Sequence, residues 1–152
     1  FILLGGICDI IDGKVARKTG LSSNFGALFD SSLDRYAELF MFLGTAIYFV
    51  QKDYPITSIM VFLAMGGSMM VSYVRARAES LGFEAKVGMM QRPERIVSIG
   101  AGALLNYPLF HLTLFHVENF GVTLLEIAIW AVAIFANYTA IHRIMHVYKQ
   151  DK

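Results

Sequence analysis

Long apolar stretches, each near the length of a membrane-spanning helix, constrain this chain more than any other feature of its sequence. A helix needs roughly 20 predominantly apolar residues to cross the hydrocarbon core of a bilayer. Only 16% of the residues are charged and 56% are hydrophobic, whereas about a quarter of the residues in a soluble domain are charged. The sequence therefore predicts an all-α integral membrane protein. The stretches that come closest to the required length are residues 26–50, Ile56–Val74, Ile96–Val117 and Phe120–Ile141.

A further apolar stretch, Phe1–Ile11, is too short to cross a bilayer by itself. No charged start or cleavage site marks it as a signal peptide. We therefore expect the sequence to begin partway through a helix of a longer membrane protein. Because the chain has no internal repeat and no Pro-rich linker, residues 1–152 are expected to form a single transmembrane domain.

Basic residues predict the orientation of this domain in the membrane. Of the 13 Lys and Arg residues, 12 fall on one face if the helices alternate in direction, and only Lys52 falls on the other. The loop after Val74 and the C-terminus then share the basic face. An excess of Lys and Arg marks the cytoplasmic side of a membrane protein. A net charge of +1 is too small to suggest a nucleic-acid partner.

Turn residues and prolines set the expected helix boundaries. We expect helices over residues 1–18, 24–50, 56–81 and 120–148, with another from residue 92 onward. Pro93 suits the first turn of that fourth helix, and Pro108 is expected to kink it, with Asn106 helping to satisfy the freed backbone.

Four aspartates interrupt the apolar pattern near the start of the chain. Asp9 and Asp12 are three residues apart, and Asp30 and Asp34 are four apart. Residues at these spacings lie on one face of a helix. Because a short turn-rich segment joins the two expected helices, we expect the helices to be antiparallel neighbours. The four carboxylates would then meet at the mouth of one cavity.

Clustered carboxylates near a bilayer repel one another and need a compensating cation. Oxygen ligands without His or Cys favour Mg²⁺ or Mn²⁺ over zinc, and carboxylates from two helices suit two ions that clamp a phosphate. Gly13 and Gly26 leave room for a bulky group beside the acids, and Arg17 suits a diphosphate. The alternative is that the acids pair with nearby basic residues in a solvated loop.

The spacing D-x2-D-G-x2-A-R-x8-G-x3-D-x3-D resembles the signature of the CDP-alcohol phosphotransferase family, also called CDP-alcohol phosphatidyltransferases. The residues that match it are Asp9, Asp12, Gly13, Ala16, Arg17, Gly26, Asp30 and Asp34. The resemblance implies a bundle of six transmembrane helices, with the first helix missing from this chain, and a homodimer. We expect a bacterial-type cytoplasmic membrane, and the excess of basic residues at the motif end predicts an active site on the cytoplasmic side.

The resemblance also implies a role for each matching residue. Asp9, Asp12, Asp30 and Asp34 would bind the metal ions, and Asp34 would also be the catalytic base. Those implied to contact the CDP-lipid are Gly13, Arg17, Ser23 and Gly26. The implied reaction is attack by an alcohol hydroxyl on a CDP-linked lipid such as CDP-diacylglycerol, with release of CMP.

The acceptor alcohol is expected to carry a phosphate, because Arg75, Arg95 and Arg143 can converge from three helices. The alternative is that these arginines anchor the helices at lipid headgroups. The patterns S-Y-V-R-A-R-A-E and R-P-E-R resemble the bacterial phosphatidylinositol-phosphate synthases of the family, whose acceptor is inositol 1-phosphate. Arg75 departs from the Lys typical there, so a phosphatidylglycerol-phosphate synthase that uses glycerol 3-phosphate stays open. Serine or free inositol would leave the arginines without a phosphate.

Two other classes of membrane protein also use acidic clusters. Intramembrane prenyltransferases bind diphosphates through two separate acidic motifs, but the next aspartate after Asp34 is Asp53, on the opposite face. A divalent-cation transporter would need acids along its pore, and the interiors of Ile56–Val74 and Phe120–Ile141 contain only Glu126. Both alternatives therefore rank below a CDP-alcohol phosphotransferase.

Overall fold

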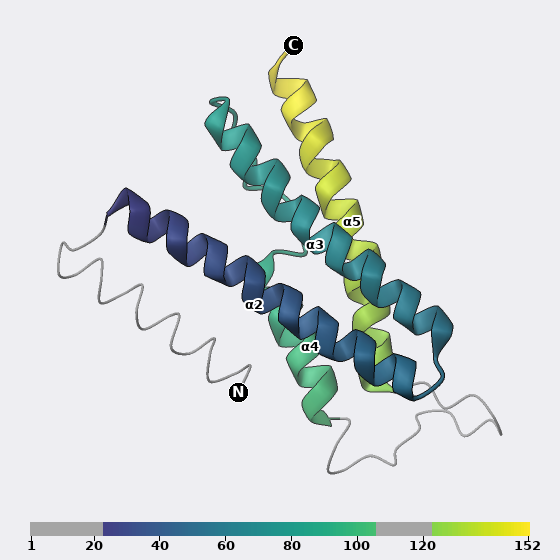
Figure 1. The fold of residues 1–152 in the computed structure, drawn as a ribbon. Coiled ribbons are helices and arrows are strands. Elements are labelled where there is room, and N and C mark those ends of the chain that lie inside the picture. The colour runs from purple at the N-terminus through teal and green to yellow at the C-terminus, as the bar shows by residue number, and fades with distance from the viewer. Residues whose placement is uncertain (1–22, 106–122) are drawn as a thin grey trace. The chain divides into compact units, whose positions relative to one another are not determined.

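The computed structural model describes residues 23–105 and 123–152, and this part of the chain is helical without strands. Its helices are α2 (Asn24–Gln51), α3 (Pro55–Ser80), α4 (Arg92–Leu105) and α5 (Leu124–Gln150) (Figure 1). The chain divides into two compact units, Phe1–Met41 and Phe42–Lys152, and α2 begins in the first and ends in the second. The single domain over residues 1–152 stays a prediction.

Local signals explain where α3 begins and ends. Pro55 occupies the first turn, where its missing N–H leaves no hydrogen bond unmade. At the other end, the N–H of Gly82 bonds Glu79 O and the N–H of Phe83 bonds Ala78 O, at 3.2 and 3.0 Å. These are the two bonds of a Schellman motif, which requires a left-handed residue. Gly82 supplies it with φ +87°.

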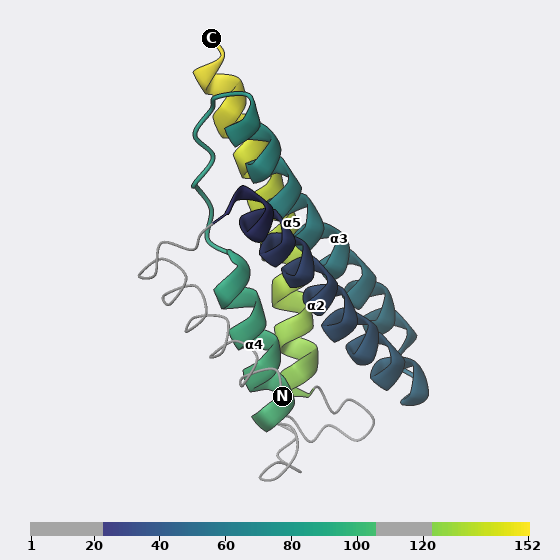
Figure 2. The ribbon, with the colours of Figure 1, turned by 60° about the vertical axis from the view of Figure 1, so that its left-hand side comes forward.

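Helix α5 is the central element of the larger unit, because it packs against both α3 and α4. Its first turn is capped by Thr123, whose hydroxyl accepts the N–H of Glu126 at 3.2 Å. Both views show α3 and α5 side by side (Figures 1 and 2).

Three hydrogen bonds fix the direction of α3 relative to α5. The Thr57 hydroxyl donates to Glu126, the Asn137 amide to Leu63 O, and the Arg143 guanidinium to Val71 O. The sequence separations are 69, 74 and 72 residues, nearly constant along the pair. The two helices therefore run parallel, as expected if α4 returns between them.

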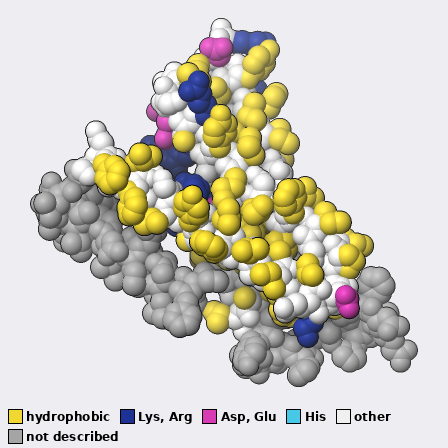
Figure 3. Space-filling model, viewed as in Figure 1, with side chains coloured by type: hydrophobic (Ala, Val, Ile, Leu, Met, Phe, Trp, Pro, Cys, Tyr) yellow, Lys and Arg dark blue, Asp and Glu magenta, His cyan; other side chains and the backbone are white. Residues whose placement is uncertain are grey.

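Small residues line the contact between α3 and α5, and large apolar residues face outward. A Cβ on Gly67 would lie 2.6 Å from the Asn137 amide nitrogen, so only glycine allows this approach. Small inward and large outward residues are typical of helices that pack within a bilayer. Figure 3 shows hydrophobic side chains over the visible face of α3. The exposed side chains include Ile56, Ile59 and Phe62 on α3 and Ile134, Tyr138 and Ile141 on α5.

Among the described residues, α3 and α5 are the helices long and apolar enough to cross a membrane. The expected helix over residues 56–81 agrees with α3 to within a residue. The last helix begins four residues later than expected, because Thr123 caps it. The expected first helix and the kink at Pro108 lie outside the described residues, and the six-helix bundle stays a prediction.

Candidate active site

Asp30 and Asp34, the described half of the predicted acidic motif, lie one turn apart on α2. Side chains at this spacing point from the same face of a helix. Asp30 is exposed and Asp34 is half-buried. Between them, the hydroxyls of Ser31 and Ser32 donate to Leu28 O at 2.9 and 2.8 Å. The helix backbone thus accepts both serine hydroxyls, and Asp30 and Asp34 are the carboxylates of this segment that share a helix face.

A pair of carboxylates supplies hard oxygen ligands of the kind that Mg²⁺ and Mn²⁺ prefer. In the part of the chain that the structure describes, three or more His, Cys, Asp or Glu side chains do not gather as they would around a metal ion. The donor chemistry of Asp30 and Asp34 fits the predicted ions, but a full ligand set would need Asp9 and Asp12. These two aspartates lie outside the described residues, as do Gly13 and Arg17.

Ser23 and Gly26 form the start of α2. The N–H of Gly26 donates to the Ser23 hydroxyl oxygen at 2.9 Å, which is the bond of an N-cap. A Cβ on Gly26 would lie 3.1 Å from that oxygen, so the glycine keeps the capped turn uncrowded. The sequence pattern did not reveal this capping role. The serine hydroxyl keeps its own hydrogen to donate, and contact of both residues with CDP stays a prediction.

In the larger unit, the predicted acceptor arginines come from three helices, and the structure places Arg75 and Arg95 within electrostatic range of Arg143. Arg143 on α5 is only 2% exposed and experiences the charges of Arg75 on α3 and Arg95 on α4. Glu79 acts on Arg143 with the opposite sign. Arg75 bonds Glu79 through Nε at 3.0 Å, and both side chains are about 40% exposed. Three arginines and one glutamate leave this cluster with a formal charge of +2.

Backbone carbonyls hold the two buried arginines of this cluster. Arg143 donates from Nε to Val87 O and from Nη1 to Val71 O, each at 2.7 Å. Arg95 donates from Nη1 to Met90 O at 3.2 Å. Carbonyl dipoles compensate buried charge only in part, because each carries a fraction of an electron charge. The guanidinium groups are therefore oriented by the fold, and contact with an acceptor phosphate stays a prediction.

Residues 82–91, which we call the α3–α4 loop, run along the last turns of α5 (Figure 2). At one end, the Glu84 backbone and the Gln150 side chain exchange two hydrogen bonds, of 3.1 and 2.7 Å. At the other end, the Met90 N–H donates to the Thr139 hydroxyl at 3.3 Å. The α3–α4 loop and the C-terminal end of α5 thus lie at the same end of the α3–α5 pair, and the side of the membrane that they face stays a prediction.

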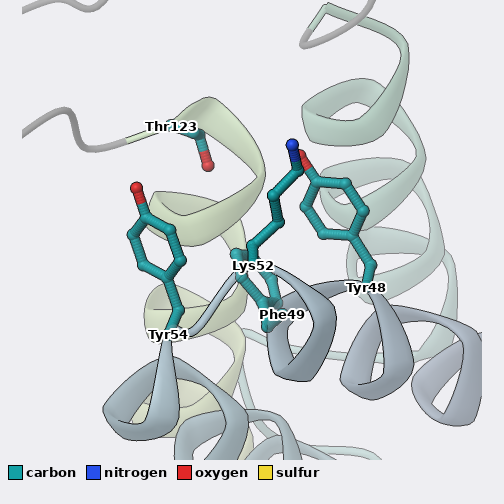
Figure 4. Close-up of a pocket in the computed structure, with 5 residues that line it drawn as sticks. All are labelled: Tyr48, Phe49, Lys52, Tyr54 and Thr123. Carbon is teal, nitrogen blue, oxygen red and sulfur yellow. The ribbon is translucent and has the colours of Figure 1, made fainter.

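The opposite end of the α3–α5 pair has a shallow pocket of about 170 Å³. Figure 4 shows the Lys52 amine beside the Tyr48 hydroxyl, with the hydroxyls of Tyr54 and Thr123 nearby. Phe49 completes its lining. The pocket contains none of the predicted site residues and lies at the far end of α3 from Arg75.

Sequence reasoning missed the groups that hold the arginines in place. Val71, Val87 and Met90 act through their carbonyl oxygens, which every residue has, so their side chains give no signal. Thr139 is fully buried and bonds the α3–α4 loop. The sequence signal for Thr139 was its hydroxyl in the middle of an apolar helix.

The sequence is similar to proteins of a known family. The family described as CDP-alcohol phosphatidyltransferase matches residues 1–138. The archaetidylinositol phosphate synthase of Methanothermobacter thermautotrophicus is 38% identical over 149 residues, which are 97% of this chain and 67% of that protein. The phosphatidylinositol phosphate synthase of Cutibacterium acnes is 42% identical over 90 residues, which are 59% of this chain and 44% of that protein.

Solved structures of phosphatidylinositol phosphate synthase from Mycobacterium tuberculosis are also similar. The complex with manganese and citrate has a TM-score of 0.77 at 26% identity and covers 91% of this chain and 63% of that chain. The complex with bound CDP-DAG has a TM-score of 0.72 at 28% identity and covers 91% and 66%. The chain thus spans between 44% and 67% of the length of these four similar chains.

Proposed function

The chain belongs to the CDP-alcohol phosphatidyltransferase family, and we propose that it transfers the lipid phosphate of CDP-diacylglycerol, or a related CDP-linked lipid, to inositol 1-phosphate with release of CMP. It is an integral membrane protein, in keeping with the apolar helices α3 and α5. Similar proteins named for inositol phosphate lipids support the acceptor. A structural neighbour with bound CDP-DAG supports the donor.

The arginine cluster is the observation that carries the choice of a phosphorylated acceptor. Arg75, Arg95 and Arg143 with Glu79 carry a formal charge of +2, and a phosphate monoester carries about −1.5 to −2 at pH 7. The two charges are opposite in sign. Serine and free inositol have no phosphate to match the cluster.

The transfer step needs a base for the acceptor hydroxyl. The hydroxyl oxygen forms a bond to the lipid-proximal phosphorus, and the anhydride bond of that phosphorus to the CMP oxygen breaks. The bonding electron pair leaves with CMP, and the hydroxyl proton passes to the Asp34 carboxylate. A carboxylate in this role must lie within hydrogen-bond reach of the hydroxyl. The position of Asp34 supports this assignment, since it lies one helical turn from Asp30 at the same face of α2 and is half-buried.

Divalent metal ions complete the proposed site. Asp9, Asp12, Asp30 and Asp34 would hold two Mg²⁺ or Mn²⁺ ions, and a structural neighbour contains manganese. When bound, the ions neutralise negative charge on the diphosphate and on departing CMP. Gly13, Arg17, Ser23 and Gly26 would bind the CDP portion of the lipid. Arg17 contributes the paired donors that suit a diphosphate.

The arginine end of the protein would face the cytoplasm of a bacterial-type cell. The excess of basic residues at that end supports this orientation. The enzyme would work as a homodimer surrounded by membrane lipids, as the family resemblance implies.

Measuring CMP release tests the reaction and the acceptor together. The full-length protein, purified in detergent, is supplied with CDP-diacylglycerol, Mg²⁺ or Mn²⁺, and one acceptor at a time. The acceptors are inositol 1-phosphate, glycerol 3-phosphate, inositol and serine. We expect the fastest release with inositol 1-phosphate and none without metal. Fastest release with glycerol 3-phosphate would establish the alternative synthase, and activity with only unphosphorylated acceptors would refute the role of the arginines.

Asp34→Asn tests the base. The substitution removes the proton acceptor but keeps the size of the side chain, so we expect turnover to be abolished and CDP-lipid binding to be retained. Asp30→Asn is the matched comparison, one helical turn away, and should raise the metal concentration needed for half-maximal activity. Residual turnover by Asp34→Asn near the wild-type rate would rule out its assignment as the base.

A further inference from the structure

The Met90 backbone connects a buried residue of α5 to an arginine of the cluster. Its N–H donates to the Thr139 hydroxyl at 3.3 Å, and its carbonyl accepts from Arg95 Nη1 at 3.2 Å. Thr139 and Arg95 are both fully buried. The position of one residue of the α3–α4 loop therefore depends on α5 and also sets where an Arg95 donor is directed.

Gly88 allows this loop to lie against α5 for two separate reasons. Its φ is +116°, a conformation that residues with a side chain rarely adopt. A Cβ at this position would also overlap the γ-methyl of Thr139 and lie 3.3 Å from its Cβ. The overlap can be relieved if the loop moves away from α5 or if Thr139 rotates about χ1, and that rotation would move its hydroxyl away from the Met90 N–H.

Gly82, at the other end of the same loop, differs from Gly88 in one respect. Its φ is +87°, so it has a comparable backbone requirement. A Cβ on Gly82 would meet no atom within 4 Å. Comparing alanine at these two positions thus separates the strain of a left-handed backbone from the loss of loop contact with α5.

Arg143 secures the loop between these contacts. Its Nε donates to Val87 O, the residue just before Gly88, and its Nη1 donates to Val71 O on α3. The loop is therefore attached immediately before and shortly after Gly88. We therefore expect a displacement of Gly88 to shift Met90 as well.

We propose that Gly88 and Thr139 are positioning residues that set the affinity for the phosphorylated acceptor, acting through Met90 on the Arg95 guanidinium. The inference rests on the proposed function, since it assigns Arg95 to the acceptor phosphate. Neither residue touches the reacting groups in this scheme. Hydrogen bonds between a guanidinium and a phosphate depend strongly on geometry. A small displacement of Arg95 therefore weakens acceptor binding while the aspartates and the CDP-lipid are unaffected.

The test compares Gly88→Ala with Gly82→Ala in the CMP-release assay. We expect Gly88→Ala to raise the KM for inositol 1-phosphate by about tenfold or more relative to Gly82→Ala, because a misplacement near 1 Å can reduce rates about a hundredfold. The KM for CDP-diacylglycerol should stay the same. A general loss of folding would instead lower activity toward both substrates alike.

Rescue provides a second readout. Thr139→Ser removes the methyl group that a Cβ on residue 88 would overlap and keeps the hydroxyl that accepts the Met90 N–H. Adding it to Gly88→Ala should recover a substantial part of the acceptor KM. If Gly88→Ala does not fold, Thr139→Val tests the same link, because it keeps the shape of the side chain and removes the acceptor oxygen.

The outcomes distinguish the inference from the function on which it rests. If the wild-type protein releases no CMP with inositol 1-phosphate, the proposed function fails. If the wild type is active but Gly88→Ala and Gly82→Ala have equal acceptor KM values, the positioning role is refuted. An unchanged acceptor KM in Thr139→Val would refute it as well.

Discussion

The two ends of the α3–α5 pair differ in how their polar side chains find hydrogen-bond partners. At one end, Arg95 and Arg143 are buried as charges and held by backbone carbonyls. At the other, Thr57 and Glu126 join the helices through side chains, and Phe49 packs edge-on between Tyr48 and Tyr54. Like charges kept close together cost free energy unless an anion joins them. Under the proposed function the arginine end binds the acceptor phosphate, whereas the aromatic end has no part in the reaction.

Arg143→Met is expected to have the largest effect, because it removes a charge of the cluster and two hydrogen bonds that hold the loop. Hydrogen bonds from a charged group contribute about 1.5–3 kcal/mol each, so we expect a loss of stability of about 3 kcal/mol or more. Activity with a phosphorylated acceptor should fall at least a hundredfold, by about 2.7 kcal/mol or more in transition-state stabilisation. Thermal unfolding in detergent and CMP release measure the two effects.

Arg77→Met is the matched control for that prediction. Arg77 is exposed in the last turn of α3, so its loss removes a positive charge from the same end without a buried contact. If both variants lose activity equally, the total positive charge at this end, and not the arrangement of the three arginines, determines activity with a phosphorylated acceptor.

Gly67→Ala tests the close contact between α3 and α5 that lies between the two ends. The added Cβ would lie 2.6 Å from the Asn137 amide nitrogen and 2.9 Å from its backbone nitrogen. We expect a loss of about 1–3 kcal/mol in stability, as for other overpacked sites. Gly66→Ala, where a Cβ meets open space, should be neutral or stabilise by about 0.5–1 kcal/mol through helix propensity. Equal unfolding midpoints for the two variants would show that the close approach contributes little.

Thr57→Val should reduce stability without changing the substrate kinetics. It removes the donor to Glu126 at the aromatic end, and polar bonds between membrane helices contribute about 0.6 kcal/mol on average. Ser58→Ala is the control, because the Ser58 hydroxyl bonds Tyr54 O within its own chain segment. A change in acceptor KM for Thr57→Val would mean that the two ends are not independent.

Lys52→Gln is expected to have the smallest effect of all. Lys52 lines the shallow pocket at the aromatic end and is exposed, and surface substitutions usually change stability by less than about 0.5 kcal/mol. The acceptor KM should match the wild type. An increased acceptor KM would contradict the assignment of phosphate recognition to the arginine end alone.

The apolar pattern and turn residues predicted most of the described fold. Residues 56–81 were expected to be helical and α3 is Pro55–Ser80, because the proline and Gly82 act within a few residues of the helix ends. The start of α5 was placed too early, at residue 120. Apolar composition does not show where helical hydrogen bonding begins. The local signal for the start of α5 was Thr123 followed three residues later by Glu126.

The charged residues of the candidate site could be predicted from the sequence. The backbone groups that hold their side chains in place could not. Arg75, Arg95 and Arg143 stand out in an apolar sequence. The partners of Arg143 are carbonyls 56 and 72 residues away, and such pairings arise only from the packing of helices. Gly88 is one of 13 glycines, and its contact with Thr139 has no local signature.

The parallel register of α3 and α5 has a mechanical consequence. Hydrogen bonds at three places along the pair have nearly the same sequence separation. Sliding one helix past the other by a single turn would break all three bonds and drive Asn137 against the side chains that follow Gly67. We therefore expect α3 and α5 to keep their register, so that an opening that admits a lipid would involve other parts of the protein.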